Sequence, residues 1–279
     1  MNAVTDQSVV LGESGEAAAV EGSRATPAED VVYAKRLEGG IEVVYLNQPR
    51  KKNALSGEMM SKLDGLLRAA DADDGARVVV LRGAGDDFSS GGDLDQGPAL
   101  EPGPEGARKT LRRYLAVVRT IRTMSKPVIA MVDGYAVGGA FALVCASDLV
   151  CASERALFVP AFCQIGIVPE MGMMKLLPDL VGPQRAKELL FFGGKIPALQ
   201  LHDWGVVNRV FPAERLEEET LAFARRLAEM PDTSIHLTKN IMNALSDGNL
   251  DACLEAESTA SPFCTTTKAY AATMEKFAR

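Results

Sequence analysis

The sequence predicts an α/β fold followed by a helical C-terminal region, and three patterns carry this prediction. Residues 77–81 and 127–132 are short apolar runs rich in β-branched side chains, as is typical of buried strands. Residues 109–122, between them, repeat apolar side chains along one helical face, which indicates a helix lying over a sheet. Strand, helix and strand in this order favour an α/β unit with a right-handed crossover. Beyond residue 214 the pattern is helical throughout.

The chain before these strands predicts a leader, a hairpin and a helix. Residues 1–30 are rich in Ala, Gly, Ser and Glu and lack a sustained apolar period, which predicts a disordered leader. Residues 31–35 and 41–46 are apolar runs on either side of a Glu-Gly-Gly turn, and they predict a β-hairpin. Ser56 is a suitable N-cap for a helix whose apolar residues recur at three- and four-residue spacing as far as Ala70.

Composition narrows the classes of function. The 279 residues are 47% hydrophobic, enough for a substantial core, and the net charge of −7 leaves no broad basic face for nucleic acid or anionic lipid. No uninterrupted apolar run approaches the roughly 20 residues that span a bilayer, and no basic region followed by an apolar one opens the chain. We therefore expect a cytoplasmic protein that binds neither nucleic acid nor a membrane.

Cysteines and histidines do not predict a metal site. The five cysteines are odd in number and form no CxxC pair, which is typical of small structural residues in a reduced compartment. His202 and His236 are the two histidines of the chain, so a histidine-rich metal site is not expected. The cysteines are Cys145, Cys151, Cys163, Cys253 and Cys264.

Two Gly-rich stretches follow the two buried strands. Residues 88–94 contain Gly91 and Gly92, and residues 133–142 contain a second Gly-Gly pair directly before an apolar helix. Adjacent glycines let the backbone approach a ligand closely, and the N-terminus of a helix has unpaired N–H groups that suit a developing negative charge. A stretch of this kind, taken alone, is more often a turn that permits close helix packing. Neither is a GxGxxG dinucleotide fingerprint or a phosphate loop.

These stretches belong to a longer ordered series that resembles the crotonase, or enoyl-CoA hydratase/isomerase, superfamily. The resemblance covers nearly the whole chain after the leader. The matching segments are residues 46–55 (LNQPRKKNAL), 88–94 (FSSGGDL), 126–130 (KPVIA) with the Gly-rich turn after it, 147–150 (SDLV), 158–172 and 204–212 (WGVVNRVFP).

The resemblance implies an architecture and an assembly. Residues 31–213 are expected to form a spiral α/β core of repeated ββα units that holds an acyl-CoA site. Residues 214–279 are expected to form a helical region that packs between the subunits of a homotrimer, or of a dimer of trimers, a homohexamer.

The resemblance also implies an oxyanion hole. In this superfamily a thioester carbonyl lies between two backbone N–H donors, one on each Gly-rich turn, and the matching positions here are Gly92 and Gly139. Such a pair stabilises an enolate, and loss of one donor typically costs about 3 to 4 kcal/mol. Coenzyme A then enters as part of the substrate, and no tightly bound cofactor is implied.

Contacts to the coenzyme A portion are expected from three parts of the chain. Cations at residues 50–52 would offset the phosphate charges, although a basic triplet also suits a solvated turn. Asp93 also suits a role in organising its own loop. The expected contacts are Arg50, Lys51, Ala54, Ser90, Gly91, Asp93, Leu94, Lys276 and Phe277.

The acid/base residues depart from the hydratase pattern. Hydratases of this superfamily carry two glutamates, and this sequence has Ala142 and Phe162 at those positions, so ordinary hydration loses its acid/base pair. Glu170 instead resembles the single acid of the Δ3,Δ2-enoyl-CoA isomerases, which moves a proton between C2 and C4. The same glutamate also suits the first turn of a helix after Pro169.

An apolar acyl pocket would favour the catalytic interpretation, because it would raise the proton affinity of a lone carboxylate. The residues expected to line it are Phe162, Ile165, Val168 and Ala142. Other enolate chemistry remains open, namely a decarboxylase, a hydrolase or an atypical hydratase of a specialised acyl thioester, which a carrier protein could hold in place of free coenzyme A. A catalytically decayed homologue that only binds acyl-CoA is the alternative from another class.

Overall fold

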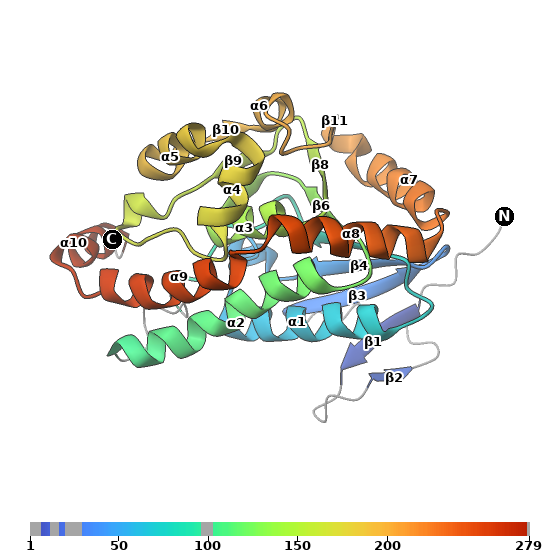
Figure 1. The fold of residues 1–279 in the computed structure, drawn as a ribbon, viewed down its shortest axis with the longest axis horizontal. Helices are drawn as coiled ribbons and strands as arrows, with labels where there is room; N and C mark the ends of the chain where they lie inside the picture. The colour runs from blue at the N-terminus through green and yellow to red at the C-terminus, as the bar shows by residue number, and fades with distance from the viewer. Residues whose placement is uncertain (1–6, 12–16, 20–29, 96–102, 278–279) are drawn as a thin grey trace.

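The computed structural model describes residues 7–11, 17–19, 30–95 and 103–277. These residues form an eight-stranded sheet, a three-stranded sheet and helices packed around them (Figure 1). The strand order in the large sheet is β11-β8-β6-β5-β4-β3-β1-β2, and in the small one β10-β9-β7.

The predicted hairpin is confirmed at the start of the core. Strands β3 (Val32–Leu37) and β4 (Ile41–Leu46) pair antiparallel, with Val32 opposite Leu46. The turn between them contains two glycines with φ of 81° and 74°, values that glycine adopts without steric cost.

The leader contains two described strands, which the prediction of a disordered leader did not include. Strand β1 (Gln7–Leu11) pairs antiparallel with β3, and β2 (Ala17–Ala19) pairs with β1, so both extend the edge of the large sheet. The free edge of β3 offers backbone partners to any extended segment, and the Val-Val-Leu run of β1 has β propensity. The other leader residues, 1–6, 12–16 and 20–29, lie outside the described residues.

Five strands of the large sheet are parallel, as the strand and helix order predicted. From β4 the order continues through β5 (Val78–Gly83), β6 (Val128–Val132), β8 (Leu149–Ser153) and β11 (Arg209–Phe211). Helix α1 (Gly57–Ala72) connects β4 to β5, and Ser56 caps it by accepting a hydrogen bond from the Met59 N–H at 3.1 Å. Helix α2 (Gly103–Thr123) connects β5 to β6.

The small sheet repeats the order of the large one, which is the spiral of ββα units that the sequence predicted. Strand β7 (Tyr135–Val137) follows β6, β9 (Leu157–Val159) follows β8, and β7 pairs parallel with β9. Single bridges join Leu55 to Gly92 and Ser89 to Ala136, so the segments after β4 and β5 continue the same series. Each repeat of the spiral thus places one strand in the large sheet and the segment after it in a second layer, which contains β7 and β9. The Gly-rich stretches lie in this second layer.

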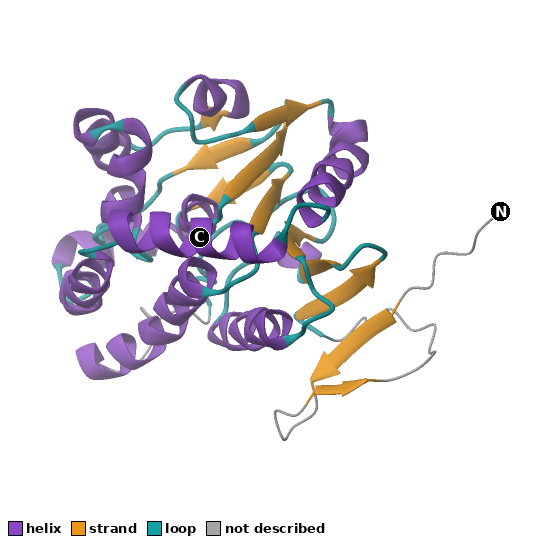
Figure 2. Cartoon of the chain, turned by 45° about the vertical axis from the view of Figure 1, so that its right-hand side comes forward, coloured by secondary structure: helices purple, strands orange, loops and turns teal. Residues whose placement is uncertain are grey.

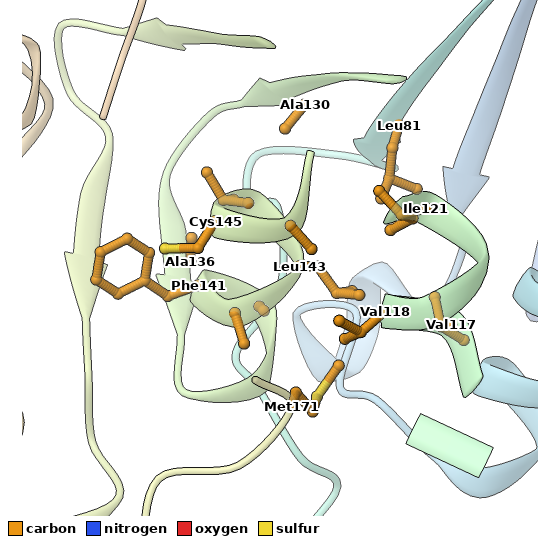
Figure 3. Close-up of a cluster of buried hydrophobic side chains, with 14 of the residues drawn as sticks. Leu81, Val117, Val118, Ile121, Ala130, Ala136, Phe141, Leu143, Cys145 and Met171 are labelled. Atoms are coloured by element: carbon orange, nitrogen blue, oxygen red, sulfur yellow. The ribbon is translucent and has the colours of Figure 1, made fainter. Parts of the chain in front are cut away.

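The large sheet is covered on both faces because its strands alternate apolar side chains between them. Val79 and Leu81 of β5 join the cluster that includes α1, α2 and α3 (Gly139–Ala146). Val78 and Val80 join the cluster on the opposite face, under α7 (Leu216–Ala228). Figure 3 shows part of the first cluster, where Val118 of α2 lies near Leu143 of α3.

Smaller elements connect β9 to the C-terminal region. They are η3 (Cys163–Ile165), α4 (Met173–Val181), α5 (Pro183–Phe192), β10 (Ile196–Pro197), α6 (Ala198–Asp203) and η4 (Ala213–Arg215). A further short helix, η1 (Pro49–Lys51), lies between β4 and α1.

Beyond residue 215 the described chain is helical, as predicted. Helices α8 (Asp232–Ser246), α9 (Leu250–Cys264) and α10 (Lys268–Phe277) follow α7, and α9 packs on α2 (Figures 1 and 2). One face of α8 exposes Leu237, Ile241, Met242 and Leu245. Assembly into a trimer or hexamer stays a prediction. Within the described part of the chain, no helix is both long and apolar enough to cross a membrane.

Candidate active site

One cavity of about 280 Å³ joins the two Gly-rich turns to the C-terminal helices. It lies between the second layer of the spiral, α2, the segment before α4, α9 and α10. Of the residues predicted for the site, Gly92, Gly139 and Glu170 line it together. The other predicted residues that line it are Ser90, Gly91, Asp93, Leu94, Phe162 and Ile165.

In the first Gly-rich turn, the Gly92 N–H has no backbone acceptor among the described residues. The Leu55 N–H donates to the Gly91 carbonyl at 2.7 Å, and the Asp93 N–H donates to the Leu55 carbonyl at 2.9 Å, so the bridge is made by the residues on either side of Gly92. Gly91 has a φ of 87°, and a Cβ there would lie 2.6 Å from the carbonyl oxygen of Val137. A glycine is therefore required for the turn to approach β7 this closely.

The second Gly-rich turn places the Gly139 N–H at the start of α3. The Gly138 N–H donates to the Val159 carbonyl at 2.8 Å, which fixes the turn just before the helix. Gly139 is the first residue of α3, and its N–H has no acceptor among the described residues. Gly92 and Gly139 both line the cavity, so each turn contributes to it a residue whose N–H has no acceptor within the described part of the chain.

Glu170 reaches the cavity from the segment before α4. The Ser261 hydroxyl of α9 donates a hydrogen bond to its carboxylate. Helix α4 begins at Met173, and Met171 and Gly172 before it have φ values of 60° and 76°. Glu170 therefore precedes the helix and is not in its first turn, which removes the capping alternative.

Burial raises the pKa of Glu170 to about 7, while the Ser261 hydrogen bond opposes this shift and the nearby Glu257 carboxylate adds to it. Burial is the largest of these causes, in the direction expected for a lone carboxylate in an apolar pocket. A pKa near neutrality suits a group that must both accept and return a proton.

Exchanging Glu170 for glutamine is expected to stabilise the fold at neutral and alkaline pH. In the unfolded chain this carboxyl ionises at its ordinary pKa of about 4.3, whereas the folded chain keeps the proton until about pH 7. The free energy of unfolding of the native chain therefore falls as pH rises between these values, and the variant lacks this loss. Thermal unfolding should show an advantage on the order of 3 to 4 kcal/mol at pH 8 and almost none at pH 4. Equal advantages at both pH values would contradict the raised pKa.

Asp93, the other predicted carboxylate in the cavity wall, is already engaged. It is buried, and one of its oxygens lies 3.2 Å from the Lys51 ammonium. The other accepts the Asp95 N–H at 2.9 Å. These contacts fit a residue that organises its loop. Of the two carboxylates among the described lining residues, Asp93 has an ion-pair partner and Glu170 has none.

Several predicted residues lie outside the cavity wall. Ala142 is fully buried one turn inside α3, within the core, so the prediction that it lines the acyl pocket is corrected. Val168 does not line the cavity either, and its neighbour Ile167 takes that place.

The remaining described residues expected to contact coenzyme A also lie outside the cavity wall. Ala54 is buried beside the first turn. Arg50 and Lys51 are exposed in η1, and Lys276 is exposed near the end of α10. Phe277 ends α10, and its side chain lies outside the described part.

Sequence reasoning missed the wall contributed by α2 and the C-terminal helices. The Tyr114 hydroxyl of α2 donates to the Leu55 carbonyl at 2.7 Å, beside the first turn. Tyr114 lies three residues after Leu111 on the apolar face of its helix, so periodicity could have found it. The C-terminal residues have no comparable signal because their stretch is largely polar. They are Ser261, Pro262, Thr265 and Tyr270.

The described residues contain no group of three or more His, Cys, Asp or Glu side chains arranged to hold a metal ion.

Comparison with known proteins agrees with the fold. The family model described as enoyl-CoA hydratase/isomerase matches residues 36–278. A solved structure of an enoyl-CoA hydratase/isomerase from Mycobacterium paratuberculosis superposes with a TM-score of 0.82 at 28% identity, covering 88% of this chain and 98% of that one.

Curated relatives carry several activities. The 1,2-epoxyphenylacetyl-CoA isomerase of Escherichia coli (strain K12) is 34% identical, over 79% of this chain and 85% of that protein. The 4-chlorobenzoyl coenzyme A dehalogenase-1 of Arthrobacter sp is 35% identical, over 78% and 80%. Enoyl-CoA delta isomerase 2 of Rattus norvegicus is 34% identical over 83% of this chain and 58% of the rat protein. The family match and the shared fold together show that this chain belongs to the enoyl-CoA hydratase/isomerase family, the crotonase superfamily.

Proposed function

We propose that the protein is an acyl-CoA isomerase that moves a double bond from C3 to C2, with Glu170 as its single acid/base. The observation that carries this proposal is one unpaired carboxylate, with a pKa of about 7, in an apolar cavity shared with the N–H groups of Gly92 and Gly139. Ala142 and Phe162 occupy the positions of the two hydratase glutamates, which argues against ordinary hydration. Similarity to two isomerases of coenzyme A thioesters supports the same choice.

The proposed reaction needs one carboxylate and two N–H donors. Ionised Glu170 removes a proton from C2 of the 3-enoyl thioester, and the electron pair moves onto the thioester oxygen as a dienolate. The N–H groups of Gly92 and Gly139 stabilise that oxyanion. Protonated Glu170 then returns the proton at C4 on the same face, the double bond settles between C2 and C3, and the carboxylate is regenerated.

Coenzyme A enters this proposal as part of the substrate, without a metal or a resident cofactor. The exposed cations Arg50 and Lys51 precede Leu55, which bridges to Gly92 of the first Gly-rich turn. From there their positive charges would offset the phosphate charges of the coenzyme. Lys276 offers a third exposed cation at the end of α10. These residues are proposed contacts, with Ser90, Gly91 and Leu94 nearer the thioester.

The direct test is conversion of a 3-enoyl-CoA by the native protein, followed by the ultraviolet absorbance of the conjugated 2-enoyl product. Because Glu170 must be ionised to begin, kcat/KM is expected to rise with pH through about 7 and then level off. Binding of the thioester without conversion would favour the decayed homologue instead. Release of carbon dioxide, free coenzyme A or a hydrated product would favour a decarboxylase, a hydrolase or an atypical hydratase.

A further inference from the structure

Helix α9 turns a polar stripe toward the segment that carries Glu170. Cys253, Glu257 and Ser261 are spaced four residues apart, so they lie on one face of the helix. Ser261 donates to Glu170, and Glu257 contacts the backbone two residues further along. The reaction proposed above uses Ser261 and Glu170 but gives Glu257 no role.

Glu257 is a fully buried carboxylate that hydrogen bonds hold in place. One of its oxygens accepts the Gly172 N–H at 2.8 Å, and the other accepts the Cys253 thiol at 3.2 Å. No cation pairs with it among the described residues, and it does not line the cavity. Burial raises the pKa of the Glu257 carboxyl above its ordinary value, and the hydrogen bonds from the Gly172 N–H and the Cys253 thiol oppose this shift by stabilising the charged form. A carboxylate kept in the core at such a cost calls for a function.

The turn that Glu257 contacts needs support. Among the described residues, Met171 is one of three other than glycine with a positive φ, a conformation that L side chains adopt only under strain. Its sulfur would lie 2.8 Å from a Cβ on Gly139, so the turn packs directly against the start of α3. Moving this turn would displace Glu170 and the contact with the second Gly-rich turn together.

We propose that Glu257 is a positioning residue for Glu170: its carboxylate accepts the Gly172 N–H and so holds the Met171–Gly172 turn that directly follows the catalytic carboxylate. This inference rests on the proposed function, because it gives Glu170 the role of base. The Glu257 charge also adds to the proton affinity of Glu170, in the same direction as burial.

The other titratable groups around Glu170 are neutral or paired, so they do not have the effect on its pKa that the Glu257 charge has. Tyr114 and Tyr270 face it with hydroxyls whose pKa values are raised by burial, so both stay neutral near pH 7. Asp93 is paired with Lys51, and Lys175 of α4 is paired with Asp179. Ser261 lowers the pKa of Glu170 through its hydrogen bond. Glu257 is therefore the unpaired charge among the described groups that acts on Glu170.

Glu257→Gln separates charge from structure, because its amide oxygen can still accept the Gly172 N–H. Loss of the negative charge should lower the pKa of Glu170, so the acidic limb of kcat should move to lower pH. Glu255→Gln is the matched control, since it removes one charge from the exposed side of α9, where Glu255 pairs with Arg108. Glu257→Leu removes the acceptor as well, and its kcat should fall about ten- to a hundredfold as the turn shifts.

The titration of Glu170 is read directly by ¹³C NMR of the full chain labelled at glutamate carboxyls, with the Glu170 signal identified by its loss in Glu170→Gln. The inference predicts a lower midpoint in Glu257→Gln than in the native chain and in Glu255→Gln. An unchanged midpoint in Glu257→Gln would overturn it, as would a Glu257→Leu variant that folds and keeps native kcat. This readout needs no substrate, so absence of isomerase activity in the native protein would refute the proposed function and leave the NMR comparison decisive for Glu257.

Discussion

Replacing Glu170 with glutamine is expected to lower the isomerase kcat by at least about a hundredfold, the lower bound typical of general acid–base catalysis. Glutamine keeps the size of the side chain and can still accept the Ser261 hydroxyl, but it cannot take a proton from C2. Binding of acyl-CoA should stay close to native because the cavity wall is otherwise intact. Steady-state assays with a 3-enoyl-CoA, together with equilibrium binding of the product, measure the two effects separately.

Glu170→Asp is the control for geometry. It retains the carboxylate but withdraws it from the cavity by about one methylene, so its kcat should lie between those of the native protein and Glu170→Gln. Native activity in Glu170→Gln would show that the mechanism is wrong. If the native protein acts on a different thioester and Glu170→Gln abolishes that reaction, the site would stand while the isomerase assignment would not.

The elements that local pattern determines were predictable from the sequence. The hairpin at β3 and β4, the capped helix α1 and the buried strands β5 and β6 each have a short-range signal in turn residues, a cap or apolar periodicity. The place of Gly92, Gly139 and Glu170 in one cavity depended on the family resemblance, because these residues are brought together by the spiral and not by spacing along the chain.

The part of the cavity wall that α9 and α10 contribute could not be predicted from local sequence patterns. Ser261 and Glu257 are polar residues of an amphipathic-looking C-terminal stretch, where such residues ordinarily face solvent. Their burial results from the packing of α9 on α2 and α4, a long-range contact without a local pattern. The wrong prediction for Ala142 has a similar cause. Periodicity places this residue on an apolar helix, but it does not indicate which turn of that helix reaches the cavity.

The Gly92 turn offers a test of the oxyanion hole with little steric disturbance. A Cβ at Gly92 would meet no atom within 4 Å, whereas one at Gly139 would lie 2.8 Å from the Met171 sulfur. The bridge to Leu55 uses the Gly91 carbonyl and the Asp93 N–H, so it does not require the Gly92 N–H. Gly92→Pro therefore deletes the N–H donor of a residue that lines the cavity, while Gly92→Ala keeps the donor and adds one methyl group.

Gly92→Pro is expected to lower kcat by about a hundred- to a thousandfold, the effect typical of losing one oxyanion donor. Gly92→Ala should keep kcat within about tenfold of native, with any steric effect of the methyl group appearing mainly in KM. Circular dichroism and thermal unfolding establish that both variants are folded before the rates are compared. Because the oxyanion forms in the transition state and not in the bound substrate, the loss should appear in kcat more than in binding. Equal kcat values for folded Gly92→Pro and Gly92→Ala would remove Gly92 from the oxyanion hole, and the dienolate would then need a donor other than the first Gly-rich turn.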